Sequence, residues 1–405
     1  DKLIFPITFE HLGKRGYEVT LYAENFQARK TWLEVILKQR DAQRAANDIY
    51  TNHTLYTSVT TGSGRVQSCA IFDGGKKLLF GFDKGIYLSN VDYLDAEGNF
   101  KPVCSTLKLI MQTQAPVMQL DAIEKYGVVV MLCDKVVSAI PLDVIVSKTD
   151  LNSHNNRNSI KQIANQVTFY KVDECLNRTL LTVVKSTNMS STIRVFELIN
   201  SSGGTQKRPQ LRRLLTAGGS SAQPDGFKML NSPIEIPSAT VSLSFLRSHL
   251  CLGCSRGFEL LDLESGKFES LLDPADTSLD FVIKREWLRP ISLYRIGKEF
   301  LLNYSDFSFF INRNGWRSRP DWIIQWECTP QNIVLSYPYL VAFDQNLIEI
   351  RNLDTELMRV IHADNVKLIR ESAHDIVYSF ENDKGKNEVV SLNFWEKAKK
   401  KKTEK

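Results

Sequence analysis

The sequence lacks any long hydrophobic run. Its longest unbroken apolar stretch, GVVVMLC from Gly127 to Cys133, is far shorter than the roughly 20 residues that a transmembrane helix needs. A charged segment followed by an apolar one, the mark of a secretory signal, is missing from the start, and the chain begins at Asp1 rather than at a methionine. We therefore expect no membrane span, and we expect this chain to be part of a longer protein.

Cysteine and histidine are scarce. The seven cysteines lack the dense spacing of a disulfide-stapled secreted domain, which favours a reducing, cytoplasmic compartment. The six histidines form no paired motif, so nothing in the sequence points to catalysis. His249, Cys251 and Cys254 invite a zinc interpretation, but a strand would place Cys254 on the opposite face from the other two, and no second cysteine pair exists. We expect buried core thiols, no metal and no cofactor.

A strong charge bias is absent as well. The formal net charge is only +5, from 51 Lys and Arg against 46 Asp and Glu. Residues 397–405 hold six lysines and one glutamate, so the rest of the chain has a net charge of about zero. We expect this lysine-rich tail to be disordered, and we expect no nucleic-acid partner, because coating a polyanion requires a larger basic surface.

What the sequence has instead is a recurring phrase of two apolar strands joined by a short turn. Each copy follows another short apolar strand, and the copies recur at intervals of roughly 35 to 70 residues, which is typical of a propeller or solenoid. About seven copies begin at Lys77, Gly127, Leu180, His249, Glu299, Tyr339 and Asp375. The sequence thus predicts an all-β, seven-bladed β-propeller. A β-helix is the structural rival, but its rungs are shorter and more uniform.

The segment LYTSVTT at Leu55 has no hairpin of its own. We expect it to supply the outer strand of the last blade and so close the ring, which would remove the open sheet edges. Two polar segments, residues 147–166 and 200–226, interrupt the propeller pattern, and the second is predicted to be a long surface loop. The propeller is expected to span residues 49–396.

Residues 1–48 follow a different pattern. LIFPITF and YEVTLYAE alternate apolar and polar residues around LGKRG, which predicts two strands and a turn. Asn25 is the predicted N-cap of a helix from Phe26 to about Asn47. One face of this helix carries Ala28, Trp32, Val35 and Ile36. Two strands and one helix cannot bury a core alone, so this segment is either a truncated domain or an appendage of the propeller.

Two segments rich in Trp and Arg are candidate partner-binding sites, because these residue types are enriched in interface hot spots. NRNGWRSRPDWIIQW, from Asn312 to Trp326, holds three of the six tryptophans. From it and from the similar KREWLR segment we select Trp316, Arg317, Arg319, Arg313, Lys284, Arg285 and Trp287. The alternative is blade packing: WIIQW alternates, so Trp322 and Trp326 share a face and at least one is expected in the core.

A basic cluster in the 200–226 loop suggests a second kind of site. It consists of Lys207, Arg208, Arg212 and Arg213. Together with the lysine-rich tail, this cluster is a candidate contact with anionic lipid, and a membrane-cortex scaffold is therefore an alternative function.

The stretch FINRNGWRSRPDWIIQWECTPQNIVLSYPYLVAFDQNLIEIRNLDT resembles the citron homology (CNH) domain. The matching positions are Asn312, Gly315, Ser318, Arg319, Ile323, Trp326, Pro330, Pro338, Tyr339, Leu340, Phe343 and Ile348 to Arg351. The resemblance covers about Ser58 to Trp395. PITFEHLGKRGYEVTLYAENFQARKTWLEVI is similar to the last strands and C-terminal helix of a pleckstrin homology (PH) domain, with Trp32 matching that helix's characteristic Trp.

A PH domain followed directly by CNH resembles the C-terminal half of fungal Rho guanine nucleotide exchange factors of the cell-wall integrity pathway. Kinases of the citron and germinal-centre types are rival parents. The resemblance implies a cytoplasmic regulatory module, recruited to the plasma membrane or cell cortex, that binds the Rho-type GTPase or the exchange domain. It implies no catalysis in this chain, since exchange would reside in an upstream Dbl-type domain. Lipid recognition does not transfer, because the early PH strands are missing.

Overall fold

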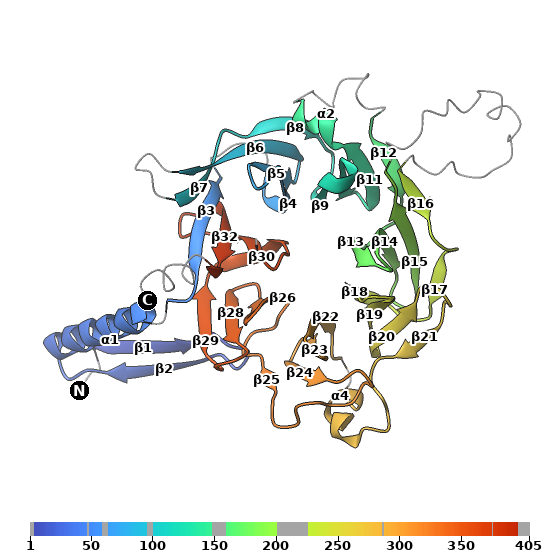
Figure 1. Ribbon diagram of the computed structural model, residues 1–405. Helices are drawn as coiled ribbons and strands as arrows, with labels where there is room; N and C mark the ends of the chain where they lie inside the picture. The colour runs from blue at the N-terminus through green and yellow to red at the C-terminus, as the bar shows by residue number, and fades with distance from the viewer. Residues whose placement is uncertain are drawn as a thin grey trace, which may run out of the picture.

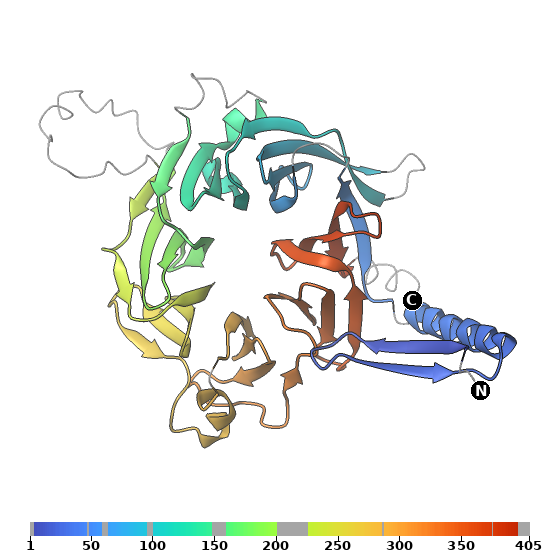
Figure 2. The same cartoon turned by 180° about the vertical axis from the view of Figure 1, so that it is seen from behind.

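The computed structural model describes residues 4–46, 48–58, 64–94, 100–147, 159–200, 226–285, 287–374 and 376–395. These residues form seven antiparallel sheets arranged in a ring around a central channel, which confirms the predicted seven-bladed β-propeller (Figure 1). An N-terminal hairpin and helix project from the rim of the ring (Figure 2). Among the described residues, no helix is both long and apolar enough to cross a membrane.

The first four blades follow one another in chain order. Blade 1 contains β4 (Val66–Phe72), β5 (Lys77–Phe82), β6 (Gly85–Leu94), β7 (Phe100–Cys104) and β8 (Lys108–Gln112). Blade 2 contains β9 (Val117–Ile123), β10 (Val128–Cys133), β11 (Val136–Pro141) and β12 (Lys161–Ala164). Blade 3 contains β13 (Phe169–Cys175), β14 (Arg178–Ser186), β15 (Ser191–Leu198), β16 (Phe227–Met229) and β17 (Ile234–Ile236). Blade 4 contains β18 (Thr240–Phe245), β19 (His249–Cys254), β20 (Gly257–Asp262) and β21 (Phe268–Ser270).

The last three blades complete the circle. Blade 5 contains β22 (Pro290–Ile296), β23 (Glu299–Tyr304), β24 (Phe307–Ile311) and β25 (Ile324–Gln325). Blade 6 contains β26 (Asn332–Ser336), β27 (Tyr339–Phe343), β28 (Leu347–Asn352) and β29 (Met358–His362). Blade 7 contains β30 (Asp364–Arg370), β31 (Ile376–Glu381), β32 (Asn387–Asn393) and, from the start of the chain, β3 (Thr51–Thr57). The short helices are η1 (Glu124–Tyr126), α2 (Leu142–Val146), η3 (Thr277–Leu279) and α4 (Asp280–Ile283).

Strand β3 closes the ring. It pairs antiparallel with β32, so blade 7 is built from both ends of the chain. The predicted closing role is confirmed, but the strand begins at Thr51 and the LYTSVTT segment supplies only its last three residues, Leu55 to Thr57. Leu55 is buried at this closure, and the Tyr56 ring lies 5.7 Å from the Phe82 ring of blade 1. β3 thereby covers the outer edge of β32, and only the short terminal strands of each blade remain as sheet edges.

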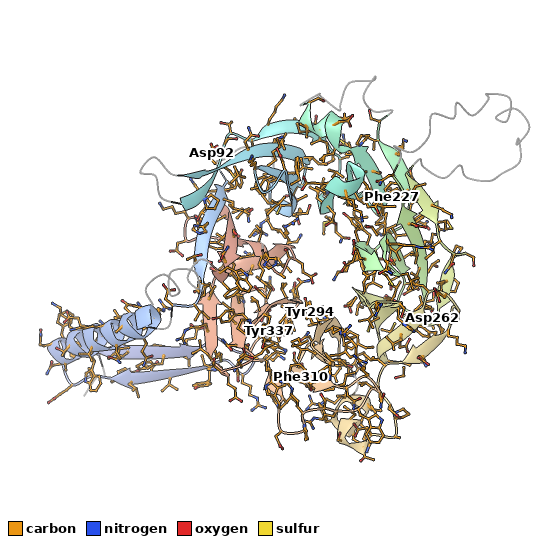
Figure 3. The ribbon with its side chains drawn as sticks, viewed as in Figure 1. Asp92, Phe227, Asp262, Tyr294, Phe310 and Tyr337 are labelled. Atoms are coloured by element: carbon orange, nitrogen blue, oxygen red, sulfur yellow. The ribbon has the colours of Figure 1, made fainter. Side chains whose placement is uncertain are left out.

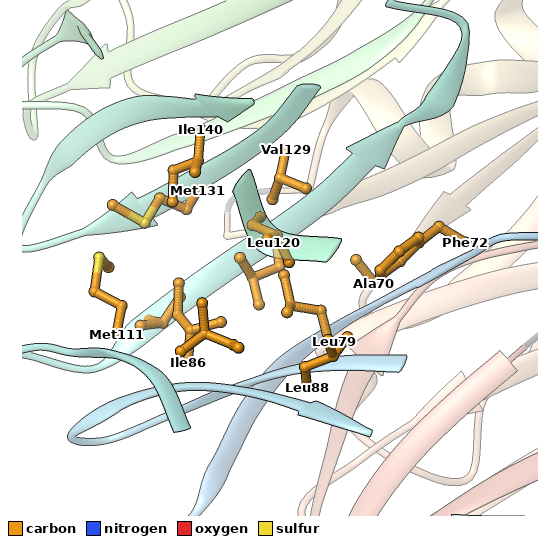
Figure 4. Packing of buried hydrophobic residues seen from close by; sticks show 13 residues of the cluster. Ala70, Phe72, Leu79, Ile86, Leu88, Met111, Leu120, Val129, Met131 and Ile140 are labelled. Carbon is orange, nitrogen blue, oxygen red and sulfur yellow. The ribbon is translucent and has the colours of Figure 1, made fainter. Parts of the chain in front are cut away.

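The hydrophobic core is divided among the junctions between neighbouring blades. In the described residues, seven buried clusters occur, and each joins two adjacent blades. Figure 4 shows the junction between blades 1 and 2, where Leu79 and Ile86 face Leu120 and Val129. The ring therefore has no single centre of stability, because each blade depends on two neighbours.

Hydrogen bonds between inner strands reinforce these junctions. Ser68 Oγ donates to the carbonyl of Val117 in the next blade at 2.6 Å, and Ser242 Oγ donates to the carbonyl of Pro290 at 3.0 Å. Each serine faces a glycine on the second strand of its own blade, the pairs being Ser68–Gly81 and Ser242–Gly253. A Cβ on either glycine would lie within 2.5 Å of the serine hydroxyl. The glycines thus leave room for the bond between blades.

The N-terminal unit consists of β1 (Pro6–His11), β2 (Tyr17–Tyr22) and α1 (Phe26–Ala46). The two strands form an antiparallel hairpin. Asn25 Oδ1 accepts a hydrogen bond of 2.8 Å from the Ala28 amide, which confirms the predicted N-cap. The turn of the hairpin points toward the ring, and α1 lies alongside the strands (Figures 1 and 2).

Candidate partner-binding surface

A short helical insertion, η3 followed by α4, precedes blade 5 and lies on its outer side, next to β24 (Figure 1). Asp276 caps the insertion: its Oδ1 accepts from the Ser278 amide at 2.9 Å and from the Ser278 hydroxyl at 2.6 Å. The hydrogen bond from the Ser278 side chain lowers the pKa of Asp276. Leu279 and Val282 pack into the core between blades 4 and 5, so the insertion is fixed to the ring.

The loop after α4 carries the most exposed tryptophan of the described chain. Trp287 is 95% exposed, and its φ of +73° lies in the left-handed region that side chains rarely adopt. Ile283, one turn earlier, is 50% exposed. A large aromatic residue held in solvent by a strained backbone contributes nothing to the core, and contiguous apolar exposure of this kind marks interaction sites. Of the two tryptophans among the predicted partner-binding residues, Trp287 is the more exposed.

Lys284 and Arg285 precede this tryptophan in the chain. The Arg285 guanidinium lies 3.5 Å from Asp306 Oδ2 and 5.4 Å from the centroid of the Phe307 ring. Lys284 pairs with Asp280 one turn earlier in α4. Both ion pairs are solvent-exposed, so they orient the cations at little cost and leave them available to a partner.

The loop between β24 and β25 packs against the same insertion. The Trp316 indole Nε1 donates to Asp273 Oδ2 at 2.9 Å, while 43% of the residue stays exposed. The Arg317 guanidinium lies 4.9 Å from the ring centroid of Phe281 in α4, and its amide donates to Asp276 Oδ2 at 2.8 Å. The two Trp/Arg segments, about 30 residues apart in sequence, therefore form one surface on blade 5. We call it the blade 5 surface, and its members are Ile283, Lys284, Arg285, Trp287, Arg313, Trp316 and Arg317.

Arg319 has a different environment. Its Nε and Nη2 bind Glu299 Oε2 at 3.1 and 2.6 Å, and its guanidinium stacks on the Phe310 ring at 3.9 Å. The hydrogen bond from Arg319 lowers the pKa of Glu299. Arg319 thus holds the β24–β25 loop on blade 5, and Arg313, in contrast, is exposed on that loop.

The other tryptophans of this segment serve the core. Trp326 is 3% exposed, and its Nε1 donates to Ser308 Oγ at 3.0 Å. Trp322 packs on Phe310 with the rings 4.6 Å apart. The expectation that at least one of the WIIQW tryptophans is buried is confirmed. Gly315 explains another motif position: its φ is +78°, and a Cβ there would lie 2.3 Å from the Leu271 carbonyl oxygen.

The central channel is a second concave region, with a volume of about 1240 Å³. Tyr294 lies at the inner edge of blade 5 (Figure 3), and its hydroxyl donates to Glu371 of blade 7 at 2.9 Å. Glu371 also lies 3.5 Å from Lys171 of blade 3. Burial raises the pKa of Asp121, on blade 2, to about 6. The charged groups of the channel therefore interact with one another across non-adjacent blades, and no histidine is among the described residues that line it.

The other sites considered from the sequence are the His249, Cys251 and Cys254 group and the basic lipid-binding candidates. Cys251 and Cys254 are buried thiols, as predicted, and burial raises the pKa of Cys254 to about 11. The His249 ring bonds to the adjacent Ser248 hydroxyl at 2.8 Å. In the described ranges, no group of three or more metal-ligating side chains occurs. The lipid candidates Lys207, Arg208, Arg212 and Arg213 and the 397–405 tail lie outside the described residues.

Sequence patterns missed the residues that shape the blade 5 surface. Asp273 and Asp276 hold Trp316 and Arg317 from about 40 positions away, and Lys14 reaches Asp306 from the N-terminal unit. These are ordinary turn residues, and no local signal distinguishes them.

Comparison with known families gives two matches in chain order. The CNH domain model matches residues 74–372, and a pleckstrin homology domain model matches residues 1–40. The first match covers most of the ring, and the second covers most of the N-terminal unit.

Curated relatives share this arrangement. The chain is 38% identical over 369 residues to "Rho1 guanine nucleotide exchange factor 1" of Schizosaccharomyces pombe, covering 91% of this chain and 26% of that protein. It is 33% identical over 397 residues to "RHO1 GDP-GTP exchange protein 2" of Saccharomyces cerevisiae, covering 96% and 28%. The chain thus spans between a quarter and a third of these relatives. A solved structure, "AfRom2 CNH domain", is 36% identical with a TM-score of 0.71, covering 85% of this chain and 100% of that one.

Proposed function

Because the chain belongs to the CNH domain family and carries a fragment of a pleckstrin homology domain, we propose that it is the regulatory interaction module of a Rho-type guanine nucleotide exchange factor. Its partner is the Rho-type GTPase, which it binds through the blade 5 surface. Exchange itself belongs to a Dbl-type domain of the parent protein. The names of the two relatives, both Rho1 exchange factors, support this assignment.

The observation that carries the proposal is the exposure of Trp287. This residue is 95% exposed, and two other large apolar residues of the blade 5 surface are exposed as well, Ile283 at 50% and Trp316 at 43%. Hot spots of interfaces combine such aromatic anchors with arginines at their edge. Here Arg285 and Arg313 supply that edge, together with Lys284. The surface therefore fits a partner with an apolar pocket bordered by acidic residues.

A direct titration tests the proposal. Purified Rho-type GTPase, loaded with GDP or with a GTP analogue, is titrated against this chain and against its Trp287→Ala variant by calorimetry. We expect at least one nucleotide form to bind the parent chain, and we expect Trp287→Ala to weaken that binding about 30-fold, the effect of a hot-spot residue.

The matched control is Met189→Ala. Met189 is 84% exposed on blade 3, between β14 and β15, so its removal changes apolar exposure without touching the blade 5 surface. The affinity of the Met189→Ala variant for the GTPase should equal that of the parent chain. Absence of binding by both nucleotide forms would refute the GTPase proposal, and equal losses for the two variants would refute the blade 5 assignment.

A further inference from the structure

The turn of the N-terminal hairpin makes a specific contact with the ring. The Lys14 amide donates to the carbonyl of Glu327, which lies between β25 and β26. The Lys14 Nζ donates to the Ser305 carbonyl at 2.8 Å and lies 3.1 Å from Asp306 Oδ1. The main chain of Lys14 thus contacts Glu327, and its side chain contacts Ser305 and Asp306, more than 20 positions earlier in the propeller.

The hairpin end is shaped for this contact. A Cβ at Gly13 would lie 2.6 Å from His11 Cε1 and 3.1 Å from the Glu327 carbonyl oxygen, so any larger residue would have to displace the His11 ring and crowd the Glu327 carbonyl. The Gly13 amide donates to His11 Nδ1 at 3.2 Å, and the His11 ring stacks on Tyr17 at 5.0 Å. These contacts fix the turn from its own side.

The receiving side is fixed by a buried charge. Glu349 is 0% exposed, and its Oε2 accepts from the amides of Glu327 and Cys328 at 3.0 and 3.2 Å. Arg351 neutralises Glu349 at 2.6 Å. A buried carboxylate with full hydrogen bonding and a paired cation imposes one geometry on the chain around it. The carbonyl that receives Lys14 is therefore held in place before the hairpin arrives.

Asp306 connects this contact to the blade 5 surface. Its Oδ1 faces Lys14 of the hairpin at 3.1 Å, and its Oδ2 faces Arg285 of the Trp287 loop at 3.5 Å. Two cations from different parts of the chain thus share one carboxylate. A partner that binds Arg285 removes one cation from Asp306, so the attraction between Asp306 and Lys14 becomes stronger. Conversely, removal of Lys14 strengthens the attraction between Asp306 and Arg285.

We propose that the propeller edge formed by Ser305, Asp306 and Glu327 is a docking site for the lysine-tipped β1–β2 turn, and that this site couples the position of the PH domain to partner binding on the blade 5 surface. The coupling is positive. An acidic partner that engages Arg285 strengthens the Lys14 contact, and by reciprocity the docked hairpin favours the partner. The docking claim stands on the contacts alone, whereas the coupling claim rests on the proposed function.

Hydrogen exchange tests the docking site in the whole chain. Lys14→Ala and Asp306→Asn should each speed exchange of the β1–β2 turn amides about two- to fivefold, as expected for loss of a partly exposed ion pair. The double variant should show no further increase, because both changes remove the same contact.

Arg15→Ala is the matched control, since Arg15 is the next residue of the same turn and makes no hydrogen bond or ion pair among the described residues. It should leave exchange unchanged. Unchanged exchange in Lys14→Ala, or an equal increase in Arg15→Ala, would overturn the docking site.

The coupling is tested by GTPase affinity in the same variants. Lys14→Ala should weaken binding about two- to fivefold although Lys14 lies outside the blade 5 surface, and Arg15→Ala should not change it. Faster exchange with unchanged affinity would overturn the coupling and leave the docking site standing. If no variant and no parent chain binds the GTPase, the proposed function fails, and the exchange result still decides the docking site.

Discussion

The ring and the N-terminal unit use their apolar residues in opposite ways. At every junction of the ring a cluster of side chains is almost fully buried, as at Val129 and Leu79, both 0% exposed. In the N-terminal unit Leu21 is 56% and Trp32 is 61% exposed, and Ile7, at 9%, is the most buried apolar side chain described. The ring is therefore complete in itself, whereas the hairpin and helix cannot stabilise one another without a further layer.

The same contrast holds between two tryptophans on blade 5. Trp326 fills the junction between blades 5 and 6 and satisfies its indole N–H, while Trp287 stands in solvent on an insertion. The elements that protrude from the ring are thus the ones whose large apolar side chains remain exposed to solvent. They also meet each other, because Asp306 contacts both the hairpin turn and the Trp287 loop.

Two truncations compare the stability that the N-terminal unit and β3 give to the ring, and we expect removal of β3 to have the largest effect. A chain that starts at residue 49 loses only the N-terminal unit, and we expect its thermal midpoint to stay within a few degrees of the full chain. A chain that starts at residue 58 also loses β3, which opens blade 7 and removes the buried Leu55. Loss of one buried leucine alone costs about 2–5 kcal/mol, so we expect the shorter chain to aggregate or to melt well below the longer one.

Calorimetry of the three chains measures this difference. Similar midpoints for the chains that start at residues 49 and 58 would show that the ring does not depend on closure by β3. A large loss already at residue 49 would show that the ring leans on the N-terminal unit, contrary to the burial pattern.

Substitution of the two tryptophans sharpens the comparison. Trp326→Ala should lower the free energy of unfolding by about 3–5 kcal/mol, because it leaves a cavity between blades 5 and 6 and removes the indole N–H that Ser308 Oγ accepts from. Trp287→Ala should change it by less than about 0.5 kcal/mol, since the side chain is exposed. Denaturant titration gives both values, and comparable losses would mean that Trp287 has a structural role.

Much of the ring could be predicted from local pattern, because each blade repeats period-two strands and tight turns. The closing role of the segment at Leu55 was also accessible, since closure demands an outer strand for blade 7 and this segment had no hairpin of its own, although the strand itself starts earlier, at Thr51. The burial of Trp326 followed from alternation. In each case the relevant physics acts within a few residues or through the symmetry of the repeat.

The candidate site was less accessible, because its contacts link distant positions. Arg317 and Arg319 look alike in the sequence, yet Arg317 stacks on Phe281 of the insertion and Arg319 pairs with Glu299 on blade 5. Nothing local distinguishes the two arginines. The contact of Lys14 with Asp306 spans 292 positions and exists only because β3 brings the start of the chain back to the ring.

Asp121 is an ionisable residue in a ring that otherwise buries apolar side chains at its junctions. Its substitution is expected to have the smallest effect of the three. Burial is the largest influence on this carboxyl and raises its pKa to about 6, against the lowering effects of Tyr170 and Arg370. The folded state therefore binds the proton more tightly than the unfolded chain, in which an aspartate has a pKa of about 3.9. Stability is lost as the pH rises from about 4 to about 6, and the full penalty, at most about 3 kcal/mol, persists above that window.

Asp121→Asn removes the charge of this half-buried carboxyl while keeping the shape of the side chain. We expect it to raise the free energy of unfolding by about 1–3 kcal/mol at pH 8 and to leave it unchanged at pH 4, where the native aspartate is already protonated. Asp173→Asn is the control, because Asp173 lines the same channel but is exposed. Denaturant titrations at the two pH values decide the matter. An equal gain in the free energy of unfolding at pH 4 and pH 8 would mean that the substitution acts through packing rather than through charge. The Asp121 carboxylate would then not destabilise the ring.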